Sequence, residues 1–154
     1  MSESLDNRDD LVSDRQPGVS ESVKPNVLIV DDEPASRSIC ADYCDLFDHA
    51  SYAVRSGGEA VAALRRERFD VVVMSVHMAG ALDAVRAIRS LPPPAAEAPI
   101  IGLTDVGKGD EAQRWMAAGL AAVLAKPITA RRLFQALNVA TESAATGVRS
   151  WAPA

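Results

Sequence analysis

The sequence has few of the features on which disulfide-stabilised, membrane-spanning or nucleic-acid-binding proteins depend. Its two cysteines, Cys40 and Cys44, are too few for a disulfide framework, which favours a reduced protein in the cytoplasm. No apolar run approaches the roughly 18 residues that span a bilayer, and the N-terminus lacks the pattern of a signal peptide. We therefore expect no membrane contact. The net charge of −5 also argues against nucleic acid as a partner, because such binding needs a basic surface.

The 154 residues do contain enough apolar material, 48%, for one folded domain. The acidic surplus is concentrated at the N-terminus, where residues 1–24 carry −3 of the net charge of −5. That segment has no aromatic residue and only isolated aliphatic ones, which predicts a disordered acidic tail at 1–24. A second, flexible tail is predicted at 141–154, where Trp151 lies among small and polar residues. The folded domain is therefore predicted to span 25–140.

Between the tails, five short apolar runs alternate with five segments of helical character. The predicted strands are 26–30, 51–55, 70–75, 99–104 and 121–126. The predicted helices are 34–47, 57–69, 82–90, 109–118 and 129–139. The apolar faces expected to pack inward are Ile39, Tyr43, Leu46 and Phe47 in the first helix and Leu133, Phe134 and Leu137 in the last. This alternation predicts an α/β fold of five βα units, with a doubly wound parallel sheet covered on both faces.

Polar residues follow or end four of the apolar runs. They are Asp31 with Asp32, then Ser75, Thr104 and Lys126. Ligands of open α/β sheets bind at the carboxyl ends of the strands, so these side chains are expected to lie at one functional edge. Paired carboxylates attract a divalent cation, and a hydroxyl or an ammonium can hold an anionic oxygen. The set is therefore typical of phosphoryl or metal chemistry.

These residues and their spacing resemble the CheY-like receiver domain of bacterial response regulators. The matching segments are 30–34 (VDDEP), 69–74 (FDVVVM) with His77 and Met78, 99–104 (PIIGLT) and 125–128 (AKPI). The amino-acid sequence is most similar to that of the receivers of hybrid histidine kinases. The resemblance implies a flavodoxin-like strand order 2-1-3-4-5 and a role in two-component or phosphorelay signal transduction. It also implies a histidine kinase, a phosphotransfer protein or another signalling protein as partner.

The resemblance assigns a role to each residue of the set. Asp31 and Asp32 are the acidic pair of the metal site, and the backbone carbonyl of His77 is the third protein ligand. Thr104 is the switch hydroxyl, and Lys126 is the ammonium that pairs with phosphate. The position of the phosphate-accepting aspartate is occupied by Ser75.

Ser75 is the main departure from the family pattern. A serine hydroxyl is a weak nucleophile unless a neighbouring base activates it, and it does not replace the missing carboxylate as a metal ligand. We therefore expect no required cofactor, and magnesium binding that is weak at most. Lys126 also loses its usual carboxylate partner, which predicts that its ammonium pairs with Asp31 or Asp32 instead.

Three further positions depart from the pattern. Asp105 follows Thr104 and puts a carboxylate where it would repel phosphate and block the pocket. Val123 stands where many receivers carry a Tyr or Phe, and Ala79 replaces the usual Pro. These changes point to a pocket no longer used for phosphorylation.

The leading hypothesis is a stand-alone atypical receiver without enzymatic activity, since the segment after the last helix is too short for a DNA-binding fold. It would act as a phosphorylation-independent protein-interaction module, a decoy or adaptor for a histidine kinase or phosphotransfer protein. One alternative is phosphoryl acceptance by Ser75, Asp31, Asp32 or Asp105. A second is a cyclic-dinucleotide-binding effector that uses the arginine clusters at 65, 66 and 68 and at 131 and 132. A third is modification of Ser75 by a Ser/Thr kinase.

Other reactive side chains have structural interpretations. Cys40 and Cys44 share one helix face and are expected to be buried structural thiols. His49 is expected to be solvated, and the ring of His77 to face solvent. For Trp115 we weigh a partner anchor and simple partial burial equally.

Overall fold

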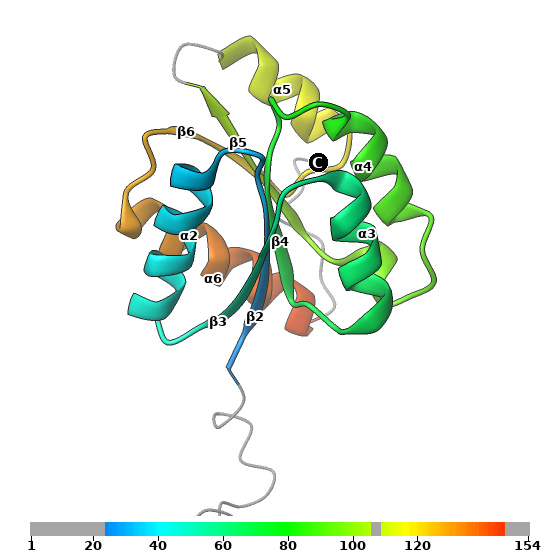
Figure 1. Ribbon diagram of the computed structural model, residues 1–154, viewed down its shortest axis with the longest axis horizontal. Helices are drawn as coiled ribbons and strands as arrows, with labels where there is room; N and C mark the ends of the chain where they lie inside the picture. The colour runs from blue at the N-terminus through cyan, green and yellow to red at the C-terminus, as the bar shows by residue number, and fades with distance from the viewer. Residues whose placement is uncertain (1–23, 106–108, 147–154) are drawn as a thin grey trace, which may run out of the picture.

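The computed structural model describes residues 24–105 and 109–146. Its centre is a parallel sheet of five strands (Figure 1). Each strand overlaps one of the predicted apolar runs. The strands are β2 (Asn26–Val30), β3 (Ala50–Val54), β4 (Val71–Ser75), β5 (Ile100–Asp105) and β6 (Ala122–Lys126). They lie in the order β3-β2-β4-β5-β6, which confirms the predicted order 2-1-3-4-5.

Helices cover both faces of this sheet (Figure 1). One face carries α2 (Pro34–Leu46) and α6 (Ala130–Thr146). The other carries α3 (Gly57–Arg66), α4 (Ala81–Arg89) and α5 (Gly109–Ala117), and a short 3-10 helix, η2 (Ala95–Glu97), precedes β5. The predicted doubly wound α/β fold is confirmed. Within 24–105 and 109–146, none of the helices is long and apolar enough to cross a membrane.

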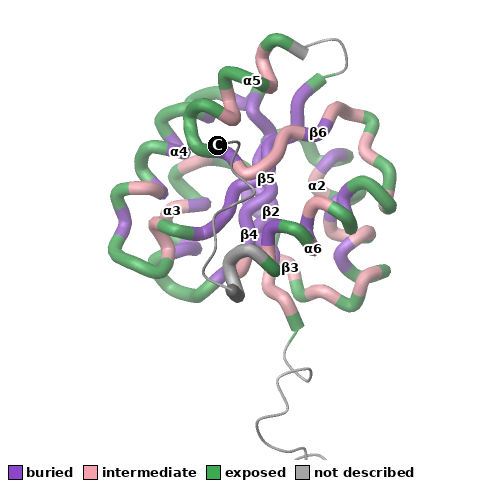
Figure 2. The backbone as a smooth tube through the Cα atoms, turned by 180° about the vertical axis from the view of Figure 1, so that it is seen from behind, coloured by how far each residue is buried: buried purple, intermediate pink, exposed green. Residues whose placement is uncertain are grey.

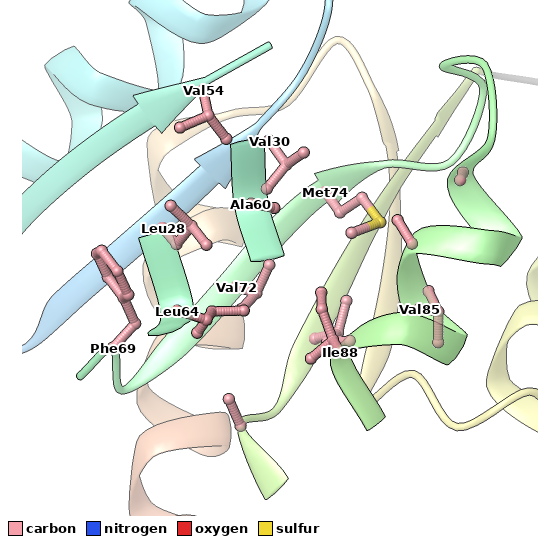
Figure 3. Close-up of a cluster of buried hydrophobic side chains, with 14 of the residues drawn as sticks. Leu28, Val30, Val54, Ala60, Leu64, Phe69, Val72, Met74, Val85 and Ile88 are labelled. Carbon is pink, nitrogen blue, oxygen red and sulfur yellow. The ribbon is translucent and has the colours of Figure 1, made fainter. Parts of the chain in front are cut away.

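The central strands supply side chains to two separate cores. Leu28 and Val30 of β2 face α3 and α4, as Figure 3 shows, whereas Val27 and Ile29 pack with α2 and α6. Successive side chains of a strand point to opposite faces, so a run of apolar residues can serve both layers. Each such residue, when fully buried, contributes roughly 1.5–3 kcal/mol. Figure 2 shows the outcome, a buried sheet inside helices whose outer faces are exposed.

Helix α2 packs through a different stripe from the predicted one. Ile39 and Leu46 are 47% and 71% exposed, so the expectation that they pack inward was wrong. Ser36, Cys40 and Cys44, spaced four residues apart, face the sheet instead. The burial of both thiols confirms their interpretation as structural cysteines.

Helix α6 is longer than predicted. It runs to Thr146, so the predicted helix end at 139 was wrong, and the boundary drawn at residue 140 falls inside a helix. No Gly or Pro interrupts the sequence before Gly147, and alanine-rich segments favour helix. The hydroxyl of Thr141 donates to the carbonyls of Leu137 and Asn138 within this extension.

The predicted tails otherwise lie outside the described residues. Residues 1–23 and 147–154, which include Trp151, are among those that the structure does not describe. Lys24, the last residue of the predicted N-terminal tail, is described, and its Nζ lies 3.1 Å from Asp48 Oδ1.

Phe134 is more exposed than predicted, and His49 is less exposed than predicted. Phe134, predicted to be buried, is 39% exposed, and His49, predicted to be solvated, packs beside it with ring centroids 6.4 Å apart. Phe47 completes this aromatic group, 4.8 Å from Phe134. The Nδ1 atom of His49 is buried and has no hydrogen-bond partner among the described residues. His49 contacts Phe134 because α6 packs next to the loop after α2, and these two segments are far apart in the sequence.

Candidate functional site

Buried polar residues gather at the carboxyl ends of the strands. Asp31 follows β2, Ser75 ends β4 and Thr104 lies near the end of β5, and they are only 1%, 3% and 4% exposed. They are three of the four buried polar residues in the part of the chain that the structure describes. Lys126 ends β6 and is paired in register with Asp105. The structure thus brings together the residues predicted to form one site.

Lys126 is held by two carboxylates. Its Nζ lies 3.3 Å from Asp31 Oδ2 and 3.6 Å from Glu33 Oε1, so the predicted pairing of Lys126 is confirmed for Asp31. The other oxygen, Asp31 Oδ1, accepts a hydrogen bond from the backbone N–H of Glu33 at 3.0 Å. A buried carboxylate needs such partners because burial removes its water. Asp32, by contrast, is exposed to solvent.

A second polar cluster surrounds the ring of His77. Its Nε2 lies 2.9 Å from Thr104 Oγ1 and 3.1 Å from Glu111 Oε1, while Asp105 Oδ2 is 4.0 Å away. His77 is an exposed residue, and its side chain is 30% exposed, so the ring contacts both solvent and the polar groups of this cluster. Glu111 reaches the cluster from the first turn of α5.

The Thr104 hydroxyl links the two sides of this cluster. The hydroxyl of Thr104 donates to Glu111 Oε1 at 3.0 Å. His77 Nε2 contacts both of these groups, and its role as donor or acceptor depends on the tautomer of the imidazole. The Thr104 hydroxyl is therefore engaged by two neighbours. The strand-end site is consequently divided into two satisfied clusters, one around Lys126 and one around His77.

The comparison with known families covers most of the chain. The family described as the response regulator receiver domain matches residues 27–138. This chain belongs to that receiver family.

Relatives of this receiver include parts of much longer sensor kinases. It is 35% identical over 133 residues to the virulence sensor protein BvgS of Bordetella pertussis, with 80% of this chain and 10% of BvgS covered. It is 27% identical over 124 residues to the sensor histidine kinase RcsC of Escherichia coli K12, with 80% of this chain and 13% of RcsC covered. The receiver thus spans 10% to 13% of the length of these kinases.

A solved structure gives the same fold. The receiver domain of the sensor histidine kinase PA1611 from Pseudomonas aeruginosa PAO1 has a TM-score of 0.70 at 25% identity. The match covers 79% of this chain and all of that domain, which was crystallised with a magnesium ion in its active site cleft.

The remaining predicted site positions lie around the two clusters. Asp105 is at the rim, with its side chain 60% exposed. Val123 faces Gly102 of β5 in register and is partly buried against the core on the α3 and α4 side. Trp115 packs partly buried against the same core, which agrees with the simpler of its two interpretations.

Two carboxylates of the receiver site were not predicted from the sequence. Glu33 pairs with Lys126, and Glu111 binds both His77 and Thr104. Glu33 stands two residues after Asp31, a spacing that could have suggested its role. Glu111 lies on a different element from its partners, and no local pattern marks it.

Proposed function

We propose that this receiver is a phosphorylation-independent interaction module that binds a histidine kinase or a phosphotransfer protein as a decoy or adaptor. The observation that carries the proposal is the residue at the end of β4. An ordinary receiver accepts phosphate there on an aspartate, and this chain has Ser75, which is 3% exposed. Nothing in the proposal requires enzymatic activity, and the free thiols of Cys40 and Cys44 fit a cytoplasmic location.

The surroundings of Ser75 do not favour phosphoryl transfer. A serine needs a base to take its proton, and among the described residues no hydrogen bond joins its hydroxyl to one. The two groups that would receive an incoming phosphate are also engaged. The ammonium of Lys126 is shared by two carboxylates, and the Thr104 hydroxyl is bound on both sides.

The donor set also does not fit a magnesium site. Magnesium prefers several oxygen ligands in octahedral geometry. Of the two acidic residues, Asp31 has Lys126 Nζ 3.3 Å from one oxygen. In the part of the chain that the structure describes, no group of three or more His, Cys, Asp or Glu is placed to hold a metal ion. We therefore propose that magnesium binds weakly at most.

The exposed apolar residues of α2 and α6 supply the docking surface in this proposal. Ile39 and Leu46 on α2 and Phe134 on α6 are each more than a third exposed. The hydroxyl of Tyr43 on α2 donates to the carbonyl of Ile128 at 3.1 Å, which ties this helix to the loop that follows Lys126. An apolar helix of a kinase or phosphotransfer protein can pack on such a surface close to the strand ends.

The deciding experiment mixes this receiver with a phosphotransfer protein that carries radiolabelled phosphohistidine and with an ordinary receiver. We expect no label on this chain, and slower transfer to the ordinary receiver as this chain is added. Acid-labile label on this chain would refute the proposal and favour a phosphoryl acceptor.

A matched pair of variants tests the docking surface. Ile39→Asp on α2 should abolish the competition. Leu82→Asp, which alters a residue of similar exposure on the opposite face, should leave it intact. Equal effects of both variants would place the contact elsewhere.

A further inference from the structure

A groove at the open edge of the sheet is lined by three arginines and a tyrosine. It has a volume of about 420 Å³, within the range of about 300–1,000 Å³ that small-molecule sites occupy. Arg37 comes from α2, Tyr52 and Arg55 from β3 and the residue that follows it, and Arg66 from the end of α3. Since β3 is the edge strand of the sheet, none of the other described strands covers this side.

The charge of the groove is positive in a chain whose net charge is negative. Of its arginines, Arg55 pairs with Glu59 at 3.6 Å. Arg37 donates to a neutral group, the Asp31 carbonyl, at 2.9 Å. Within the described residues, neither Arg37 nor Arg66 has a carboxylate within ion-pair distance. Three guanidinium groups therefore face one carboxylate.

The positive charge of the groove also affects the carboxyl group of Glu59. The backbone N–H of Arg55 donates to Glu59, and together with the nearby guanidinium groups of Arg55 and Arg37 it lowers the pKa of that carboxyl. Arginine suits phosphate because its planar donors can bind two oxygens at once.

The aromatic side of the groove is built from Tyr52. Tyr52 is 45% exposed, and its ring is backed by the buried ring of Phe69, with centroids 6.5 Å apart and planes 29° apart. The guanidinium of Arg66 lies 5.8 Å from the centroid of the Tyr52 ring. A flat ring and a flat guanidinium, in the same groove as Arg37 and Arg55, form a surface on which an aromatic base can stack.

We infer that this groove binds a nucleotide, with the base stacked against Tyr52 and Arg66 and the phosphate held by Arg37 and Arg55. The groove adjoins the strand-end site through the contact of Arg37 with the Asp31 carbonyl. Its proposed role does not depend on the proposed interaction with a kinase. It differs from the two arginine clusters considered in the sequence, because only Arg66 belongs to this groove as well.

The test is isothermal titration calorimetry of the full chain with four probes: inorganic phosphate, guanosine, GMP and cyclic di-GMP. We expect one molecule of GMP or cyclic di-GMP per chain, and binding of phosphate and of guanosine at least about tenfold weaker. A response to cyclic di-GMP alone would identify the dinucleotide as the ligand source. Phosphate binding as tight as nucleotide binding, or no heat with either nucleotide, would overturn the inference.

Three variants localise the site. Tyr52→Leu and Arg66→Gln should each weaken nucleotide binding about fivefold or more, the loss expected for one base stack. Both residues are exposed, so these changes should leave the fold intact, and circular dichroism verifies this. Arg131→Gln on α6 is the control and should bind normally. Equal affinities for all three variants and the unaltered chain would overturn the assignment to this groove.

Discussion

Replacing Lys126 by alanine should destabilise this receiver far more than an ordinary surface lysine would. The change leaves Asp31, which is 1% exposed, without its cationic partner at 3.3 Å. Coulomb's law at an effective dielectric constant of 20 gives about 5 kcal/mol for unit charges at that separation. Solvent reaches part of the pair, because the Lys126 side chain is 22% exposed. We therefore expect the free energy of unfolding to fall by about 2–4 kcal/mol. This is slightly less than the roughly 3–5 kcal/mol typical of a fully buried pair that loses one partner.

Urea unfolding followed by circular dichroism measures this loss, and Lys24→Ala provides the matched control. The ion pair of Lys24 with Asp48 is exposed on both sides, 57% and 82%, so its removal should cost less than about 0.5 kcal/mol. The double variant Asp31→Asn with Lys126→Ala should regain stability relative to Lys126→Ala, because no buried charge is left unpaired. A Lys126→Ala variant as stable as Lys24→Ala, or a double variant with simply additive losses, would refute this account of the site.

Three other perturbations follow from the described contacts. Ser75→Asp should raise magnesium affinity, measured by calorimetry, yet accept phosphate poorly from a phosphorylated partner until Asp105→Ala is added; full phosphorylation of the single variant would show that Asp105 is no obstacle. Burial raises the pKa of Cys40 from 9.0 to about 11 and that of Cys44 to about 12. Stability measured by urea unfolding should therefore fall as the pH rises above about 9, since the unfolded state then loses these protons first; a flat profile there would contradict the burial argument. Gly102→Ala should cost about 1–3 kcal/mol in thermal unfolding, because its Cβ would meet a side-chain atom at 2.6 Å, and an unchanged midpoint would show that the neighbours adjust freely.

The sequence was sufficient for the fold because its strands carry their own signal. The continuous apolar runs at 27–30 and 71–74 are typical of strands buried on both faces of a parallel sheet, and all of these residues are buried. The position of the site followed from the same logic, since Asp31, Ser75 and Lys126 each stand where a run ends.

What could not be predicted depends on contacts between distant segments. Periodicity placed Ile39 and Leu46 on one apolar face of α2. The rotation of the helix against the sheet decides which face is buried, and in this fold it is the face of Ser36, Cys40 and Cys44. Glu111 joins Thr104 only because α5 begins beside the end of β5. The covering of His49 by α6 is of the same kind. Single-residue patterns contain no information on such pairings.

The contact between Lys126 and Asp31 also bears on how long each molecule stays folded. It joins residues 95 positions apart, and it reaches across the ends of β4 and β5, which lie between β2 and β6 in the sheet. Contacts of such long sequence separation require a large loop to close, so this one is expected to form late in folding. A contact absent from the transition state slows unfolding without speeding folding. The ion pair between Lys126 and Asp31 is thus expected to lower the rate constant of unfolding.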